Sequence, residues 1–346
     1  MPLTSISPAR IAVTGLFSLL IVLNFLTACN STEAQEQSPL KQRRLERLLR
    51  RNSEETLNTS NATNMVLREL SVGGLLRNYY IYTPSSYRQD RAMPLVLAFH
   101  GGRGRGDRLA QNTGLNDLAE QKGFIVVYPN GVNNHWNDGR NTSDPRFQRV
   151  DDVSFVAAVI DDMAKFKNID SRRIYAAGTS NGGFFTQRLA CEMSDRIAGF
   201  ASVSATLPKS IQSTCNPRRS SIPILMINGT ADDIVPWRGG RMTQGEGGDI
   251  LSVRDTVEFW RKHNANYNNA QVEQLPTIQS DGTRVLRSQY SGSRSKSQDV
   301  VLYTVEGGGH GWPGSRLRRP VAVGKISQNL NASTVIWNFF DQRPLQ

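Results

Sequence analysis

Residues 173–193 read RIYAAGTSNGGFFTQRLACEM, and this stretch decides the expected fold. Its beginning predicts a buried strand and its second half predicts a helix. Between the two, Gly178-Thr-Ser180-Asn-Gly182 matches the G-x-S-x-G pattern of a nucleophile elbow, a sharp strand-to-helix turn that exposes a serine. The strained turn needs small residues two positions before and after Ser180, and both are glycine. Ser180 is therefore the predicted nucleophile.

Strand and helix signals alternate along the rest of the chain. A β-hairpin is predicted over residues 66–82, turning at Gly73-Gly74. Alternating elements predict an α/β protein with a mainly parallel central sheet, helices on both faces and this N-terminal hairpin. The glycine-rich residues 237–249 are expected to form a surface loop near the carboxyl edge of the sheet. Further strands are predicted at 94–99, 124–128, 200–203, 224–227 and 300–305, and further helices at 107–122, 151–166, 251–263 and 334–341.

Composition limits the class of protein. Hydrophobic residues make up 38% of the 346 residues, which excludes a disordered chain and a polytopic membrane protein. Lys and Arg outnumber Asp and Glu by 41 to 30, a net charge of +11 that favours anionic partners without choosing among them. Three cysteines without a C-x-x-C pair exclude a disulfide-dense scaffold and most structural zinc sites. We expect no metal and no organic cofactor, and the oligomeric state stays open.

The N-terminus has the layout of an export signal. An apolar run ends in Leu26-Thr-Ala-Cys29, which resembles the bacterial lipobox, where the peptide is cut before the cysteine that receives lipid. We expect a lipoprotein signal at 1–28, a polar and basic tether at 29–65, and a catalytic domain at 66–346. The protein is then secreted across the inner membrane and held in the cell envelope through Cys29, or released. Nucleic acid is not an expected partner, despite the basic segment at 40–51.

A serine hydroxyl needs a base to become a nucleophile, and that base needs an orienting carboxylate. In this fold the chain order is serine, acid, histidine, and of the four histidines His310, in a glycine-rich loop after the predicted strand 300–305, fits best. The acid is expected after the strand at 224–227, where Asp232 and Asp233 compete.

The segment His100-Gly-Gly-Arg-Gly104 follows a predicted strand and resembles the loop that completes an oxyanion hole. Its expected donors are the N–H of Asn181 and that of Gly102 or Arg103, whereas His100 is expected to support the loop. Arg103 and Arg105 are unusual beside such a loop and are either solvated or selective for an anionic substrate group. The candidate walls of the substrate pocket are Trp136, Trp237 and Trp312.

The chain resembles the secreted polyhydroxybutyrate-depolymerase and feruloyl-esterase group of α/β-hydrolases. The resemblance implies the α/β-hydrolase fold, with Ser180 as nucleophile, Asp232 as acid and His310 as base. It also implies a disulfide from Cys191 to Cys215, which an exported chain would allow. The motifs that carry it are Phe99–Gly102, Tyr128–Gly131, Trp136–Arg140, Asp151–Val153, Gly178–Gly183, Gly229–Asp232, Val235-Pro236, Gly307–His310, Trp312–Gly314 and Ile336–Phe340.

The family also suggests a reaction. We expect a serine carboxylic-ester hydrolase that works through an acyl-enzyme on soluble esters: hydroxyalkanoate oligomers, feruloyl or acetyl esters of sugars, or short acyl esters. One departure is Asn228, where the family usually has histidine before the Gly-Thr of the acid loop. The alternatives are a catalytically inactive, lipid-anchored binding protein on a hydrolase scaffold, and a peptidase of the same fold.

Overall fold

The computed structural model describes residues 64–142, 149–244, 247–292, 296–316 and 323–345. The predicted signal, Cys29 and nearly all of the tether lie outside these ranges, so those predictions stay predictions. Within the described ranges, no helix combines the length and apolar character that crossing a bilayer requires.

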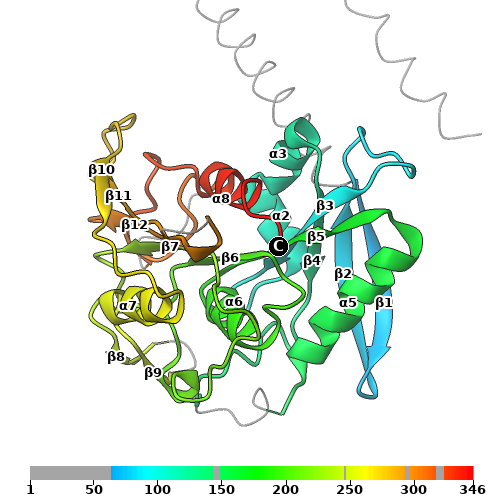
Figure 1. The fold of residues 1–346 in the computed structure, drawn as a ribbon, viewed down its shortest axis with the longest axis horizontal. Coiled ribbons are helices and arrows are strands. Elements are labelled where there is room, and N and C mark those ends of the chain that lie inside the picture. The colour runs from blue at the N-terminus through cyan, green and yellow to red at the C-terminus, as the bar shows by residue number, and fades with distance from the viewer. Residues whose placement is uncertain (1–63, 143–148, 245–246, 293–295, 317–322, 346) are drawn as a thin grey trace, which may run out of the picture. The chain divides into compact units, whose positions relative to one another are not determined.

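Ten strands form one large sheet (Figure 1). Their order across the sheet is β1-β2-β4-β3-β5-β6-β7-β12-β11-β10. The six central strands are parallel, and antiparallel pairs extend the sheet at both edges. The strands are β1 (Met65–Val72), β2 (Leu75–Tyr82), β3 (Met93–Phe99), β4 (Ile125–Pro129), β5 (Ile169–Thr179), β6 (Gly199–Val203), β7 (Ile224–Gly229), β10 (Gln271–Gln274), β11 (Arg284–Tyr290) and β12 (Val300–Glu306).

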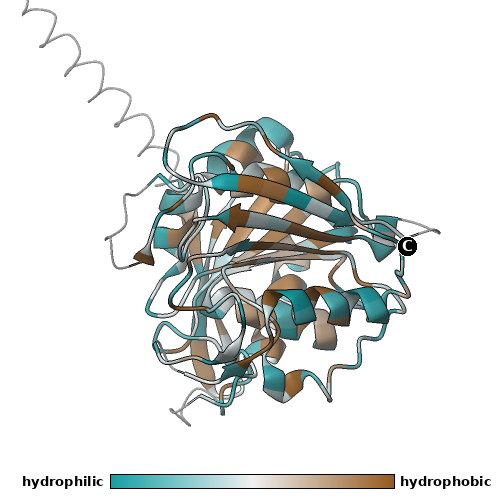
Figure 2. Cartoon of the chain, turned by 90° about the vertical axis from the view of Figure 1, so that its left-hand side faces the viewer, coloured by the Kyte–Doolittle hydropathy of each residue, from teal (hydrophilic) through white to brown (hydrophobic). Residues whose placement is uncertain are grey.

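Helices cover both faces of this sheet, which Figure 2 shows as an apolar interior with polar outer helix surfaces. One face packs against α5 (Asp152–Phe166), α6 (Asn181–Glu192) and α7 (Val253–His263), and the other against α2 (Gly106–Thr113), α3 (Leu115–Lys122) and α8 (Ala332–Phe340). Strand β3 illustrates why both faces of the sheet are covered. Its side chains alternate between two apolar clusters, with Leu95, Leu97 and Phe99 in one and Val96 and Ala98 in the other. The predicted α/β-hydrolase fold is therefore confirmed.

Most predicted elements are present, and two differ for identifiable reasons. The single helix expected at 107–122 is two helices, because Gly114 adopts φ +67° and ends α2 in the left-handed region. The predicted loop 237–249 contains a short hairpin, β8 (Gly240–Arg241) and β9 (Asp249–Ile250). Strands β10, at the edge of the sheet, and β11, next to it, were not predicted, since polar residues dominate both strands and leave no apolar alternation.

The expected disulfide is present. Cys191, near the end of α6, is bonded to Cys215, 24 residues further along the chain. Between them lie β6 and the short helix Lys209–Ile211. The bridge therefore closes the chain segment that follows the predicted nucleophile helix, and it stabilises the fold mainly by restricting the unfolded chain.

Candidate active site

Ser180 occupies the turn between β5 and α6, as the sequence predicts. Its backbone has φ +56° and ψ −123°, a conformation that residues other than glycine rarely adopt. The flanking glycines are required by space: a Cβ on Gly178 would lie 2.1 Å from the Gly182 carbonyl oxygen, and one on Gly182 would lie 2.4 Å from the Phe99 carbonyl oxygen. The local sequence therefore permits a turn that larger residues would prevent.

Three side chains from distant parts of the chain form one hydrogen-bonded series. His310 Nε2 lies 2.9 Å from Ser180 Oγ, and His310 Nδ1 lies 2.8 Å from Asp232 Oδ2. The other oxygen of Asp232 accepts hydrogen bonds from the backbone N–H groups of Ile234 and Val235, which hold the carboxylate in place. Such an arrangement can take a proton from the hydroxyl and stabilise the resulting imidazolium.

Asp232 is the carboxylate that contacts the imidazole, so the geometry separates the two acids that the sequence left open. Asp232 is 5% exposed, whereas Asp233 points into solvent. Asp232 lies in the loop after β7, and His310 lies in the loop after β12. The two loops are neighbours because β7 and β12 are adjacent and parallel, with their carboxyl ends at the same edge of the sheet. A Cβ on Gly229 would lie 2.3 Å from the Gly308 carbonyl oxygen, so the acid loop and the histidine loop are in close contact.

The loop after β3 lies directly against Ser180. A Cβ on Gly101 would lie 3.2 Å from Ser180 Cβ. Asn181 is the first residue of α6, so its N–H has no partner within the helix and is free to face an oxyanion. The Arg103 N–H, however, donates to the Asn134 carbonyl at 2.9 Å. Arg103 was therefore wrong as a backbone donor, which leaves Gly102 as the second candidate.

Comparison with known proteins identifies the family. Residues 77–216 match the model of the family described as Esterase PHB depolymerase. The chain is 31% identical over 282 residues to "Putative esterase NocK" of Nocardia uniformis subsp. tsuyamanensis, covering 79% of this chain and 81% of that protein.

The chain belongs to the PHB depolymerase esterase family. It is a carboxylic ester hydrolase, and relatives named as esterases recur among the matches. It is 33% identical over 165 residues to the bifunctional acetylxylan esterase/xylanase XynS20E of Neocallimastix patriciarum, covering 48% of this chain and 23% of that protein. It is 28% identical over 242 residues to feruloyl esterase B of Piromyces equi, covering 68% and 42%. The chain thus spans less than half the length of these two relatives.

Solved structures with a similar fold include the acetyl xylan esterase from Aspergillus awamori. That structure is 14% identical, with a TM-score of 0.47, and the match covers 69% of this chain and 92% of that one. A thermostable esterase matches with a TM-score of 0.43 at 20% identity, covering 58% and 51%.

A cleft of about 740 Å³ opens beside Ser180 and His310 in this esterase. The tryptophans predicted to wall it do not line it. Trp136 is buried, stacks on Phe185 and donates its indole N–H to the His100 carbonyl. Trp312 is buried with its indole N–H on Ser333 Oγ, and Trp237 packs against the core. All three were wrong as pocket walls because their apolar rings are used in packing.

The cleft wall of the esterase consists instead mainly of arginine and other long side chains, together with the apolar Ile234 and Val323. Arg105 is the N-cap residue of α2, with an extended backbone, and Arg108 lies in the first turn of that helix. Met242 and Gln244 come from the β8–β9 hairpin region, which no motif marks. The side chains that line the cleft are Arg103, Arg105, Arg108, Arg140, Ile234, Met242, Gln244 and Val323.

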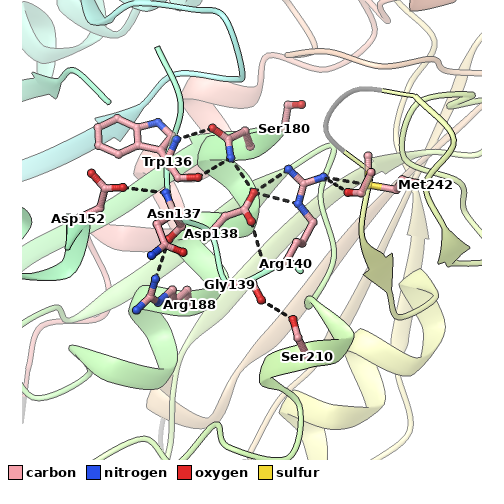
Figure 3. A network of polar contacts seen from close by, with 12 residues as sticks. Trp136, Asn137, Asp138, Gly139, Arg140, Asp152, Ser180, Arg188, Ser210 and Met242 are labelled. Atoms are coloured by element: carbon pink, nitrogen blue, oxygen red, sulfur yellow. Dashed lines mark hydrogen bonds and ion pairs between the residues drawn. The ribbon is translucent and has the colours of Figure 1, made fainter. Parts of the chain in front are cut away.

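A buried polar network supports the nucleophile turn of the esterase (Figure 3). The Asn181 side chain pairs with the backbone of Trp136 through two hydrogen bonds of 2.8 and 3.0 Å, and it donates to Asp138 at 2.6 Å. Asp138 forms an ion pair with Arg140 at 2.7 Å, and each side chain is 2% exposed. Asn181, the residue that follows Ser180, is thus held by a buried ion pair of which only Arg140 lines the cleft.

The segment Trp136–Arg140 is also connected to the N-terminal hairpin, through Asp152. Asp152 accepts from the Asn137 N–H at 2.7 Å and from Arg77, on β2, at 2.6 Å. Burial raises the pKa of Asp152, an effect that Arg77 and the Asn137 N–H oppose. Arg188, on α6, donates to the Asn137 carbonyl. The position of Asn137 is therefore fixed by contacts that involve α5, α6 and, through Asp152, β2.

His100 hydrogen-bonds the loop after β3 to the loop after β4. Its Nε2 lies 3.0 Å from the Gly131 nitrogen and its Nδ1 2.8 Å from the Gly101 carbonyl oxygen. Because an N–H only donates and a carbonyl only accepts, Nε2 is the acceptor and Nδ1 carries the proton. The imidazole is neutral, and burial lowers the pKa of His100 to about 4 although the bond to Gly101 acts in the opposite direction.

This neutral histidine predicts acid sensitivity. Its pKa is about 4 in the folded protein and 6.5 when unperturbed, so the unfolded chain binds more protons between these values. Stability should therefore fall as the pH decreases from 6.5 to 4, by up to about 3 kcal/mol from this group. Urea unfolding of the wild type and His100→Asn across this range measures the effect. Equal pH dependence in both proteins would contradict it.

Proposed function

We propose that this esterase acts through Ser180, His310 and Asp232 by way of an acyl-enzyme. Ser180 Oγ attacks the ester carbonyl while His310 Nε2 takes its proton, and Asp232 stabilises the imidazolium through Nδ1. The N–H groups of Asn181 and Gly102 hold the oxyanion. His310 then returns the proton to the leaving alcohol. Water, deprotonated by the same imidazole, then attacks the acyl-serine; the acyl–Oγ bond breaks, the imidazolium returns its proton to Ser180 Oγ, and the acid is released.

The observation that carries this proposal is the continuous series of two hydrogen bonds, 2.9 and 2.8 Å long, from hydroxyl to imidazole to carboxylate. Ser180 lies in a strained turn beside the cleft. Helix α6 begins at the next residue, Asn181, whose backbone N–H has no partner within the helix. These features are those expected of a serine nucleophile with a general base and an electrostatic stabiliser.

The proposed substrates are soluble esters: hydroxyalkanoate oligomers, feruloyl or acetyl esters of sugars, or short acyl esters. Relatives named as acetylxylan and feruloyl esterases support this range. On the sequence of its first 29 residues, we propose that the enzyme is exported and anchored in the cell envelope by lipid at Cys29.

A fluorophosphonate probe tests the proposal, because it phosphonylates only a serine that is activated as a nucleophile. We expect stoichiometric labelling, with mass spectrometry placing the adduct on Ser180. A panel of methyl ferulate, acetylated xylan, hydroxybutyrate oligomers and p-nitrophenyl esters, compared by kcat/KM, then ranks the substrates. A chain that neither reacts with the probe nor hydrolyses any ester would be an inactive binding protein, whereas turnover confined to peptides would indicate a peptidase.

A further inference from the structure

Arginines gather on one side of the cleft that holds Ser180. Arg103, Arg105 and Arg108 line it from the loop after β3 and from the start of α2. Gly101 of the same loop contacts Ser180, and consecutive Cα atoms are 3.8 Å apart, so the Arg103 Cα is within about 8 Å of the Gly101 Cα. These guanidinium groups are therefore within reach of a substrate whose ester lies at the serine.

Two of the four arginines of the cleft carry charge that the described residues do not neutralise. Arg105 pairs with Asp107 at 3.1 Å and with the Tyr80 hydroxyl, and Arg140 is paired with buried Asp138. Among the described side chains, Arg103 and Arg108 form no ion pair.

Acidic side chains do not offset this charge from within the cleft. The described cleft lining contains no carboxylate. Asp232 is buried behind His310, and Asp233 is exposed outside the lining although its backbone carbonyl lies 3.5 Å from the Gln244 amide. The cleft therefore has an excess of about two positive charges beside the reacting serine.

The backbone holds Arg103 in this position. Its φ is +60°, a value that favours glycine, yet the N–H bond to Asn134 and the turn bond from Gly104 to Gly101 fix the loop. The Arg103 side chain is exposed to solvent. Its guanidinium, planar and weakly hydrated, is suited to a carboxylate, which it can bind through two parallel hydrogen bonds.

We propose that Arg103 and Arg108 bind a carboxylate of the substrate, so that the enzyme prefers esters that carry an anionic group a few atoms from the scissile bond. This inference rests on the proposed function, because it assumes that the ester carbonyl is held at Ser180. Clefts of one charge sign concentrate ligands of the opposite sign and strengthen their binding. The acyl part or the alcohol part of the ester can supply the carboxylate.

Matched esters test the preference. Monomethyl adipate against methyl hexanoate places the charge on the acyl side, and 3-acetoxybutyrate against its amide places it on the alcohol side. We expect kcat/KM to be about 10-fold higher for the anionic member of at least one pair at low salt, and the ratio to fall at 0.5 M NaCl. A preference in one pair also locates the carboxylate. Ratios of one or less in both pairs would overturn the inference.

Variants assign the preference to these arginines. Arg103→Asn keeps a residue that tolerates positive φ, and Arg108→Gln keeps the length of an exposed helical side chain. The double variant should reduce the anionic-to-neutral ratio to about one. The matched control is Arg254→Gln on α7, where the side chain is 91% exposed and outside the cleft lining. Its ratio should equal that of the wild type; an undiminished ratio in the double variant would refute the assignment.

A binding measurement separates this inference from the proposed mechanism. Calorimetry with Ser180→Ala should show tighter binding of monomethyl adipate or 3-acetoxybutyrate than of the neutral partner, and the arginine double variant should abolish the difference. Equal affinities would overturn the anion site even if Ser180 proves to be the nucleophile. Conversely, tighter anion binding in a chain that fluorophosphonate does not label would support the site and reject the mechanism.

Discussion

Replacing Ser180 with alanine is expected to lower kcat/KM for p-nitrophenyl acetate by roughly 10⁴-fold or more. The substitution removes the oxygen that would form the acyl-enzyme, and no other described side chain lies 2.9 Å from His310 Nε2 in the same way. The remaining activity would come from the oxyanion donors and from binding.

Stability should change little in this variant. Alanine keeps the Cβ and the strained backbone at φ +56°, so only one hydrogen bond, to His310, is lost. Such a bond contributes about 1 kcal/mol, which corresponds to a Tm shift of roughly 2–4 °C. Initial rates and a thermal melt of the two proteins measure both effects. Ser86→Ala, at an exposed serine, is the matched control. Turnover above about one hundredth of the wild-type rate would place the nucleophile elsewhere.

Replacing Asp138 with alanine, which removes the buried partner of the cleft residue Arg140, is expected to be strongly destabilising. Asp138 and Arg140 are each 2% exposed, and removal of the carboxylate takes away the anion that lies 2.7 Å from the buried guanidinium. Breaking a buried ion pair in this way typically costs 3–5 kcal/mol. Arg140 keeps its bonds to Met242 and the Gly247 carbonyl, so we expect about 3 kcal/mol in urea unfolding.

The same variant should also slow catalysis. Asn181 loses the acceptor of its 2.6 Å hydrogen bond, and its own backbone N–H is the proposed oxyanion donor. Because loss of a whole donor costs 10²–10³ in rate, partial displacement should lower kcat about 10-fold with little change in KM. Asp138→Asn, which keeps the shape, should recover part of both losses.

An exposed pair provides the comparison. Asp161 pairs with Arg196 at 2.5 Å, and its side chain is 60% exposed. Asp161→Ala should cost less than about 1 kcal/mol and leave kcat unchanged, since surface ion pairs contribute little. Equal losses of stability and of kcat in the two alanine variants would show that burial does not increase the contribution of the Asp138–Arg140 pair.

The sequence alone predicted the elements that have strong local signals. Continuous apolar runs marked the buried parallel strands, and the G-x-S-x-G turn marked Ser180, because only glycine fits where the backbones approach within 2.1–2.4 Å. The fold and the disulfide were correct. The order of serine, acid and histidine along the chain also selected the residues that the structure brings together.

Tertiary structure decided what depends on contacts between segments that have no pattern in common. Asp232 rather than Asp233 reaches the imidazole, because the Asp232 carboxylate is turned inward by two backbone N–H groups of its own loop. Likewise, only the folded structure shows that the Arg103 N–H donates to the Asn134 carbonyl and is therefore not a candidate oxyanion donor.

The residues of the cleft wall could not be predicted from the sequence either, because they come from segments that share no sequence pattern. Large aromatic residues suggested pocket walls, but burying an indole ring stabilises the fold strongly, and the rings of Trp136 and Trp312 lie in the core. The arginines that line the cleft come from a loop, a helix N-cap, a helix and a second loop, so no sequence periodicity connects them. Local sequence thus determined where the chain turns and which residues carry reactive groups. Long-range packing determined which of those groups come into contact, because only the folded sheet aligns the carboxyl ends of β3, β5, β7 and β12.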